Sequence, residues 1–231
     1  MPTSRLEAFS DGVLAIIITI MVLELHVPDR PELSALLDES GTGLLTYLLS
    51  FIYIGIYWNN HHHMFQVTER ISGAVLWANL HLLFWLSLLP FTTAWVDGSG
   101  FARVPMIAYG VDLFAAAIAY FLLQSAIVHG QGPDSALRRA VGRDAKGKLS
   151  PVFYLTAIAI ALFAEPAWRP AIWLSMACYV TVAVWWLVPD RRIERYLAAR
   201  EKSPAAIGDG PAGAGPAGSV TGPPGADPPD R

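Results

Sequence analysis

Residues 5–25 read RLEAFSDGVLAIIITIMVLEL, and this stretch decides the fold class. Its apolar part runs from Phe9 to Leu25 and approaches the roughly 20 residues that a helix needs to cross a hydrocarbon core of about 30 Å. Ser4 and Glu7 precede the apolar part with the S-x-x-E spacing of a capping box. The stretch therefore predicts a membrane-spanning helix that starts near Ser4.

Five more apolar segments follow the first one. They run from Leu44 to Met64, Ala74 to Val96, Val104 to Val128, Ser150 to Glu165, and Pro170 to Pro189. Ser150 followed by Pro151 is typical of a capping residue and the first helical position. The chain is 54% hydrophobic and only 15% charged, unlike an ordinary soluble protein. We therefore predict an all-α membrane protein with six transmembrane helices. The net charge of −3 gives no indication of nucleic-acid binding.

Basic residues alternate between the two sides of the predicted membrane domain. The segments before the first span and after the second, fourth and sixth spans hold most of them: Arg5; Arg70; Arg138, Arg139, Arg143, Lys146 and Lys148; Arg191, Arg192, Arg195, Arg200 and Lys202. The other three loops hold only Arg30, Arg103 and Arg169. Because basic loops stay on the cytoplasmic side, we predict a multi-pass protein of the cell membrane with both termini in the cytosol.

The composition divides the chain into three parts. Residues 1–190 form the six-helix transmembrane domain, and residues 191–202 are a basic cytosolic extension of the last helix. Residues 203–231 are rich in Pro, Gly and Ala, with almost no large apolar side chain. Such a segment cannot bury enough surface to fold, so we expect a disordered cytosolic tail. Cys178 is the single cysteine of the chain, which excludes an intramolecular disulfide.

Several short motifs occur in a fixed order along residues 4 to 190. They are Phe9-Ser10-Asp11 with Arg5 ahead of it, Leu23-Glu24-Leu25-His26-Val27-Pro28, the group Tyr57, Trp58, His61, His62 and His63, and the third-span pair Asn79-Leu80 followed by Ser87-Leu88-Leu89-Pro90-Phe91. In these motifs the chain resembles prokaryotic members of the transmembrane protein 175 family of potassium channels. Any one of the motifs alone is a weak signal, and their order makes the combined signal strong.

The resemblance implies a K+ channel without a cofactor, not an enzyme. It implies a homotetramer of six-helix subunits in the lipid bilayer, with the first helices lining the pore. The family lacks the carbonyl filter T-V-G-Y-G, and here Tyr109-Gly110 has no such context. The resemblance also maps the family's narrowest isoleucine onto Ile16 and its selectivity-linked threonine onto Thr19.

Helical geometry supports one face of the first span as a pore face. At roughly 100° per residue, Ile16, Thr19, Ile20 and Leu23 fall within one sector, whereas Asp11 lies about 140° from Ile16. If Ile16 points to a central axis, Ile16, Ile20 and Leu23 form stacked apolar rings with Thr19 beside them. We predict that these rings form the constriction, and that Asp11 points toward neighbouring helices.

A carboxylate within a membrane helix is costly without a partner. The groups expected at the depth of Asp11 form a predicted structural polar network: Arg5, Phe9, Ser10, His61, His62, His63, Asn79 and His81. The alternative is an Asp11 side chain that extends to the interface. Three consecutive histidines also invite a metal site, but on a helix they point about 100° apart and do not converge. We therefore expect no metal.

Two further carboxylates have alternative interpretations. Asp112 lies inside the fourth span, where it is either a buried tie to another helix or a functional group. Glu24 at the outer end of the first span is either an acidic ring at the pore mouth, once repeated in a tetramer, or a solvated interfacial side chain. The alternative function is a secondary or proton-coupled transporter that uses Asp112 and the histidines. An intramembrane hydrolase is disfavoured because no nucleophile or metal triad is evident.

Overall fold

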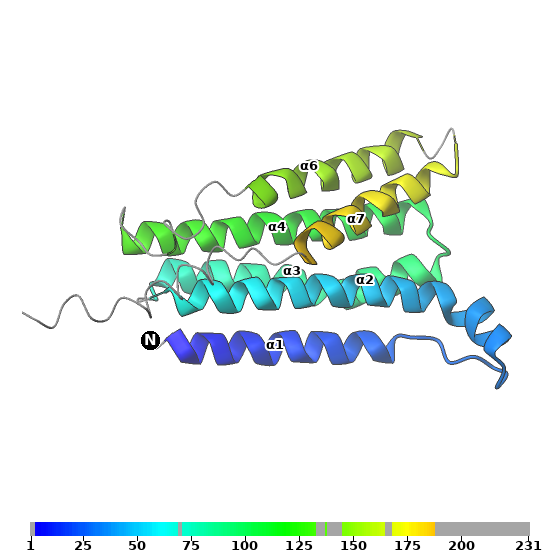
Figure 1. Ribbon diagram of the computed structural model, residues 1–231, viewed down its shortest axis with the longest axis horizontal. Coiled ribbons are helices and arrows are strands. Elements are labelled where there is room, and N and C mark those ends of the chain that lie inside the picture. Colours follow the sequence, from blue (N-terminus) through cyan, green and yellow to red (C-terminus); the bar gives the residue numbers. More distant parts are fainter. Residues whose placement is uncertain (1–2, 69–70, 133–136, 138–144, 165–167, 188–231) are drawn as a thin grey trace, which may run out of the picture.

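A computed structural model describes residues 3–68, 71–132, 137, 145–164 and 168–187 (Figure 1). Within these ranges the secondary structure is entirely helical. The elements are α1 (Thr3–Leu23), α2 (Leu33–Gln66), α3 (Gly73–Gly98), α4 (Arg103–Gln131), α6 (Ala145–Ala159) with the π-helical turn η1 (Ile160–Ala164), and α7 (Ala171–Leu187). The basic clusters around Arg70 and Arg138, the predicted extension 191–202 and the predicted tail 203–231 lie outside the described residues.

The six predicted apolar helices are confirmed. Helices α1 to α4 are each long and apolar enough to cross a membrane, and two shorter apolar helices, Leu149–Ala164 and Ala171–Leu187, complete the set. The chain is therefore a multi-pass membrane protein. The helices lie side by side along the long axis, with α1 at one edge of the bundle and α6 at the opposite edge (Figure 1). Within the subunit, α1 packs against α3 and α2.

Tyrosines bind the centre of the bundle together. Tyr53 on α2 and Tyr179 on α7 are both fully buried. The Tyr53 hydroxyl donates a hydrogen bond to the Tyr179 carbonyl at 2.6 Å, and the Tyr179 hydroxyl donates to the Met106 carbonyl on α4 at 3.1 Å. A buried phenol requires such a partner. These bonds join three helices that are distant in sequence.

The second helix begins at Leu33, eleven residues before the predicted Leu44. Polar contacts hold this additional segment: the Ser40 hydroxyl donates to the His26 carbonyl at 2.8 Å, and the Thr42 hydroxyl donates to the Asp97 carboxylate at 3.1 Å. The same carboxylate packs so closely on Gly43 that a Cβ there would collide with it. Figure 1 shows the start of α2 extending beyond the other helices, at the end of the bundle away from the N-terminus.

The capping residues predicted for two helices are wrong. Helix α1 already includes Thr3, so Ser4 is an internal residue and not the N-cap. Helix α6 begins at Ala145, which places Pro151 inside the helix and not at its first position. The Ser150 hydroxyl donates to the Lys146 carbonyl at 2.9 Å, the i to i−4 bond that serine makes within a helix. Ser150 therefore does not cap α6.

Candidate pore helix and its polar contacts

Helix α1 has a buried face and an opposite exposed face. The buried face consists of Leu6, Ser10, Leu14, Ile17 and Met21, which repeat every three or four residues as a helix packed on one side requires. These side chains pack against α2 and α3. The other side of α1 has no partner within the described part of the subunit.

The predicted constriction residues all lie on the exposed side. The exposed fractions are 58% for Ile16, 43% for Ile20 and 80% for Leu23. Thr19 is exposed between them, and its hydroxyl donates to the Ile16 carbonyl at 2.9 Å. An exposed apolar stripe on a subunit faces lipid, a neighbouring subunit or a narrow pore. The subunit therefore leaves this stripe free for the role predicted from sequence.

The apolar stripe also borders an open groove between α1 and α3. The groove has a volume of about 530 Å³ and is lined on the α1 side by Ile16 and Ile20, and on the α3 side by Pro90 and Phe91. Glu24, one residue past the end of α1, lies at the same groove and is exposed. An apolar side chain from outside the subunit fits such a groove better than water does.

Three residues of the predicted polar network form one buried chain. The Ser10 hydroxyl donates to the Leu6 carbonyl at 2.9 Å and accepts a hydrogen bond from Asn79 Nδ2 at 2.9 Å. The Asn79 Oδ1 atom lies 2.8 Å from His61 Nε2. All three of Ser10, His61 and Asn79 are buried. The chain thus joins α1, α2 and α3.

The directions of these bonds fix the tautomer of His61. Because the Ser10 hydroxyl already donates to a carbonyl, it must accept from Asn79, and Asn79 Oδ1 must then accept from His61. His61 consequently carries its proton on Nε2. Its Nδ1 atom is buried and has no hydrogen-bond partner among the described residues.

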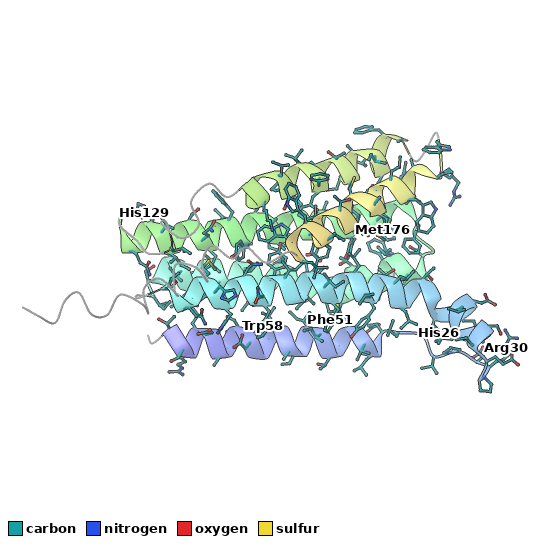
Figure 2. All side chains as sticks on the ribbon, in the orientation of Figure 1. His26, Arg30, Phe51, Trp58, His129 and Met176 are labelled. Atoms are coloured by element: carbon teal, nitrogen blue, oxygen red, sulfur yellow. The ribbon has the colours of Figure 1, made fainter. Side chains whose placement is uncertain are left out.

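Asp11 does not join the buried chain. Its Oδ1 atom accepts a hydrogen bond from Trp58 Nε1 at 3.0 Å, and the residue is partly exposed. Figure 2 shows Trp58 on the side of α2 that faces α1. Asp11 therefore has a tryptophan partner in place of the predicted histidine.

A second contact between α1 and α2 lies one helical turn closer to the N-terminus. His62 Nδ1 lies 2.6 Å from Glu7 Oε1, and the His62 ring stacks at 19° on Trp58. His62 Nε2 lies 2.8 Å from Gln66 Nε2, an amide donor. His62 thus donates from Nδ1 and accepts at Nε2. The spacing of four residues between Glu7 and Asp11, matched on α2 by Trp58 and His62, was the signal in the sequence for this pairing.

The remaining predicted members lie outside the buried chain. Phe9 and Arg5 are exposed on α1. His63 Nδ1 lies 3.5 Å from Gln66 Oε1. His81 is exposed on α3, and its Nε2 atom accepts from Trp85 Nε1 at 2.9 Å. Among the described residues, no three His, Cys, Asp or Glu side chains are placed to hold a metal ion.

Asp112 belongs to a separate polar cluster deeper in the bundle. It is 3% exposed, and its Oδ2 atom accepts from the Thr92 hydroxyl at 3.1 Å, which ties α4 to α3. Nearby, Ser50 on α2 bonds the Thr93 hydroxyl at 2.7 Å and the Tyr109 hydroxyl at 3.0 Å. Asp112 Oδ1 has no hydrogen-bond partner in the described part of the chain. Among the described residues, Asp112 makes no hydrogen bond to the α2 histidines.

The backbone around Tyr109 and Gly110 is part of α4. Gly110 packs against the Tyr179 side chain and leaves no room for a Cβ atom. Its role is therefore close helix packing. Carbonyl groups inside a helix accept helical hydrogen bonds and are not free to surround an ion.

Comparisons with known proteins agree with this architecture. The family described as endosomal/lysosomal potassium channel TMEM175 matches residues 5–90. A potassium channel of Chryseobacterium sp. (strain P1-3) is 48% identical over 197 residues, which covers 85% of this chain and 98% of that protein. A potassium channel of Chamaesiphon minutus is 32% identical over 197 residues, covering 79% and 92%.

A solved structure extends the match to three dimensions. The crystal structure of a lysosomal potassium-selective channel TMEM175 homolog from Chamaesiphon minutus superposes with a TM-score of 0.65 at 30% identity, and covers 80% of this chain and 96% of that one. The long stretches of identity, the family match across α1 to α3 and the shared fold lead to one conclusion: this chain is a prokaryotic member of the TMEM175 family.

Proposed function

We propose that this chain forms a potassium-permeable channel in which α1 lines the conduction path. Ile16, Ile20 and Leu23 make the apolar constriction, and Thr19 lies beside them. The observation that carries the proposal is the exposed apolar stripe on α1, opposite the face that packs on the subunit. The relatives named as potassium channels support the choice of ion.

A narrow apolar ring resists wetting, so an ion must lose part of its hydration shell to pass. K+ holds its water less tightly than Na+ and loses less. The channel therefore prefers K+ modestly, without the stronger discrimination of a carbonyl filter. K+ is the permeant ion, and the function requires no cofactor or catalytic residue.

The proposed assembly is a homotetramer in the cell membrane, with both termini in the cytosol. One α1 stripe cannot enclose a pore, whereas four stripes around an axis can. The groove between α1 and α3, with its exposed Phe91, offers an apolar surface for the neighbouring subunit. Glu24 would then recur four times near the outer mouth.

Recording from purified protein in a planar bilayer tests the function. With K+ on one side and Na+ on the other, we expect unitary currents. The reversal potential should be shifted from zero toward the equilibrium potential of K+. Replacing Ile16 with Asn should wet the constriction, raise the conductance and move the reversal potential toward zero. Thr19→Val should alter the selectivity and leave the pore open.

The control must place the same change on an exposed apolar site away from α1. Ile18, about 200° from Ile16 on the helix, packs against the core and is unsuitable. Val184 on α7 is 57% exposed, close to the 58% of Ile16. Equal shifts from Val184→Asn and Ile16→Asn would contradict the assignment of the constriction. Flux without unitary currents would instead support the transporter alternative.

A further inference from the structure

The outer end of α1 is not packed against the rest of the subunit. Met21 is the last buried residue of the helix, and Val22 and Leu23 are 45% and 80% exposed. The backbone N–H groups of Glu24 and Leu25 donate to the Met21 and Val22 carbonyls at 3.4 Å, longer than the usual length of about 3.0 Å. The last turn of α1 therefore needs support from outside the helix.

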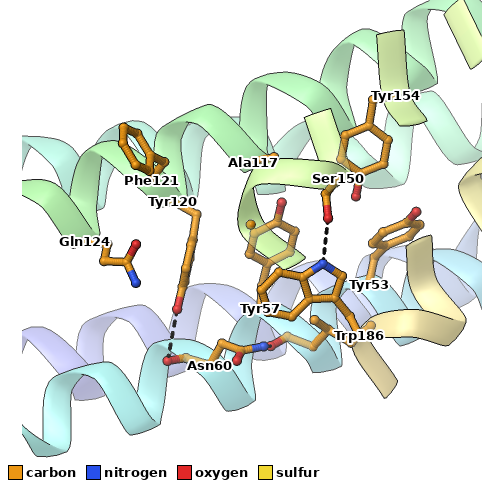
Figure 3. A pocket seen from close by; sticks show the side chains of 12 residues that line it. Tyr53, Tyr57, Asn60, Ala117, Tyr120, Phe121, Gln124, Ser150, Tyr154 and Trp186 are labelled. Atoms are coloured by element: carbon orange, nitrogen blue, oxygen red, sulfur yellow. Dashed lines mark hydrogen bonds between the residues drawn. The ribbon is translucent and has the colours of Figure 1, made fainter. Parts of the chain in front are cut away.

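Other helices of the subunit are joined directly by hydrogen bonds from side chains. In the pocket between α2, α4, α6 and α7, Trp186 Nε1 on α7 donates to the Ser150 hydroxyl on α6 at 2.7 Å (Figure 3). The Tyr120 hydroxyl on α4 donates to the Asn60 carbonyl on α2 at 3.4 Å. Beyond Met21, the side chains of α1 make no such bond to a described residue of another helix. The attachment there is made by the segment that follows α1, residues 24–32.

Two adjacent residues of α2 hold this connecting segment. The Glu39 Oε2 atom accepts a hydrogen bond from the Asp29 backbone N–H at 2.9 Å, and the Ser40 hydroxyl donates to the His26 carbonyl at 2.8 Å. Ser40 is 3% exposed, and Glu39 is partly buried. Both bonds are made to backbone groups of the segment. They therefore fix the path of the chain as it leaves α1.

The charge of Glu39 contributes less than its hydrogen bond. Arg30 Nη2 lies 3.7 Å from Glu39 Oε1, and His26 Nε2 lies 4.0 Å from Glu39 Oε2. Both distances exceed that of a hydrogen bond, and the Arg30 and His26 side chains are more than half exposed. Ion pairs of this kind contribute little to stability. A neutral amide at position 39 can therefore replace the carboxylate as acceptor.

The part of α2 that holds the segment is itself anchored to α3. The Thr42 hydroxyl, three residues beyond Glu39, donates to Asp97 Oδ1 at 3.1 Å, and the Asp97 carboxylate packs on Gly43. Asp97 belongs to the last turn of α3. A continuous series of contacts thus runs from α3 through α2 and the connecting segment to the outer end of α1.

We propose that Glu39 and Ser40 are positioning residues for the outer end of the pore, which they hold through residues 24–32. The inference rests on the proposed function, in which α1 lines the conduction path. Without these bonds the last turn of α1 opens locally, because a segment with few buried contacts opens at a small cost in free energy. The ring of Leu23 side chains then widens, and discrimination between K+ and Na+ falls.

Hydrogen exchange measured by mass spectrometry tests the attachment, with the full-length protein in lipid nanodiscs. In Glu39→Ala, the amides between residues 20 and 29 should exchange at least tenfold faster than in the wild type. Glu39→Gln keeps an acceptor oxygen for the Asp29 N–H and should restore the wild-type exchange. Ser40→Ala should give a smaller, severalfold increase.

Recording in planar bilayers tests the consequence for the pore. Glu39→Ala should lower the permeability ratio of K+ to Na+ at least twofold, and Glu39→Gln should leave it unchanged. A residue that only stabilised the fold would change the number of active channels and not the permeability ratio of each one.

The matched control is Asp38→Ala, which removes the same charge from the neighbouring, exposed position of α2. It should change neither the exchange nor the permeability ratio. Equal changes in Asp38→Ala and Glu39→Ala would assign the effect to surface charge and overturn the proposal. Faster exchange in Glu39→Ala with an unchanged permeability ratio would also overturn it. An absence of unitary currents in the wild type would contradict the proposed function itself, and is distinguished by exchange that still responds to Glu39→Ala.

Discussion

The two polar clusters of the bundle have different connectivity. In the Ser10–Asn79–His61 chain, Asn79 is the single link between two buried partners on other helices. In the deeper cluster, the Thr92 hydroxyl lies within 3.3 Å of the Leu88 and Leu89 carbonyls as well as 3.1 Å from Asp112. The first cluster attaches α1 through one residue, whereas Thr92 in the second cluster has alternative acceptors. Loss of one member should therefore be more harmful in the first cluster.

The largest effect is expected from Asn79→Leu. This change leaves the buried His61 Nε2 donor without its acceptor, at a cost of about 1–3 kcal/mol, while Ser10 keeps its bond to the Leu6 carbonyl. We expect a clear loss of folded protein, measured as the apparent Tm by fluorescence-detected size exclusion. The control is Asn59→Leu, at an exposed position two residues before His61 on α2, and it should have little effect. An unchanged Tm for Asn79→Leu would show that the chain does not hold α1.

An intermediate effect is expected from Trp58→Phe. The phenyl ring keeps the stacking on His62 and removes the donor to Asp11, a loss of about 1 kcal/mol for one partly exposed hydrogen bond. A double-mutant cycle with Asp11→Ala, which removes the acceptor oxygen, measures the coupling between the two residues. The apparent Tm of the double variant should equal that of the less stable single variant. Fully additive losses would mean that Asp11 acts through another partner, such as a neighbouring subunit.

The smallest effect is expected from Asp112→Leu. Thr92 keeps its carbonyl acceptors, and the substitution removes a buried carboxylate atom that has no partner among the described residues. The apparent Tm should change by an amount equivalent to less than about 1 kcal/mol. K+ currents should persist. Abolished K+ transport in a stable Asp112→Leu protein would contradict the scaffold role and favour the coupled transporter.

The sequence was sufficient for the spans and for part of the polar network. The apolar runs are long, so hydropathy alone located the six helices. Ser10, His61 and Asn79 were expected together because they lie at the same depth on adjacent helices. The partner of Asp11 was not predicted, since tryptophans near membrane interfaces are frequent and carry no specific signal.

The early start of α2 was also missed, for a different reason. Residues 33–43 contain two glycines and two carboxylates, which is typical of a loop. Contacts remote in sequence, from Ser40 to His26 and from Thr42 to Asp97, override that local preference. The Ser150-Pro151 pair is a second such case. Proline is common at the first position of a helix, but α6 begins at Ala145 and continues through Pro151.

The overhang of α2 has an electrical consequence. A helix of 34 residues is about 51 Å long, so roughly 20 Å of it stands outside a hydrocarbon core of about 30 Å. The adjoining stretch from residue 24 to residue 42 holds five carboxylates and one arginine. Figure 2 shows His26 and Arg30 at this end of the bundle. Cations are attracted within about 8 Å of such a surface at physiological salt. The local cation concentration therefore exceeds that of the bulk, so currents through the channel should fall less steeply than the bath concentration when salt is diluted.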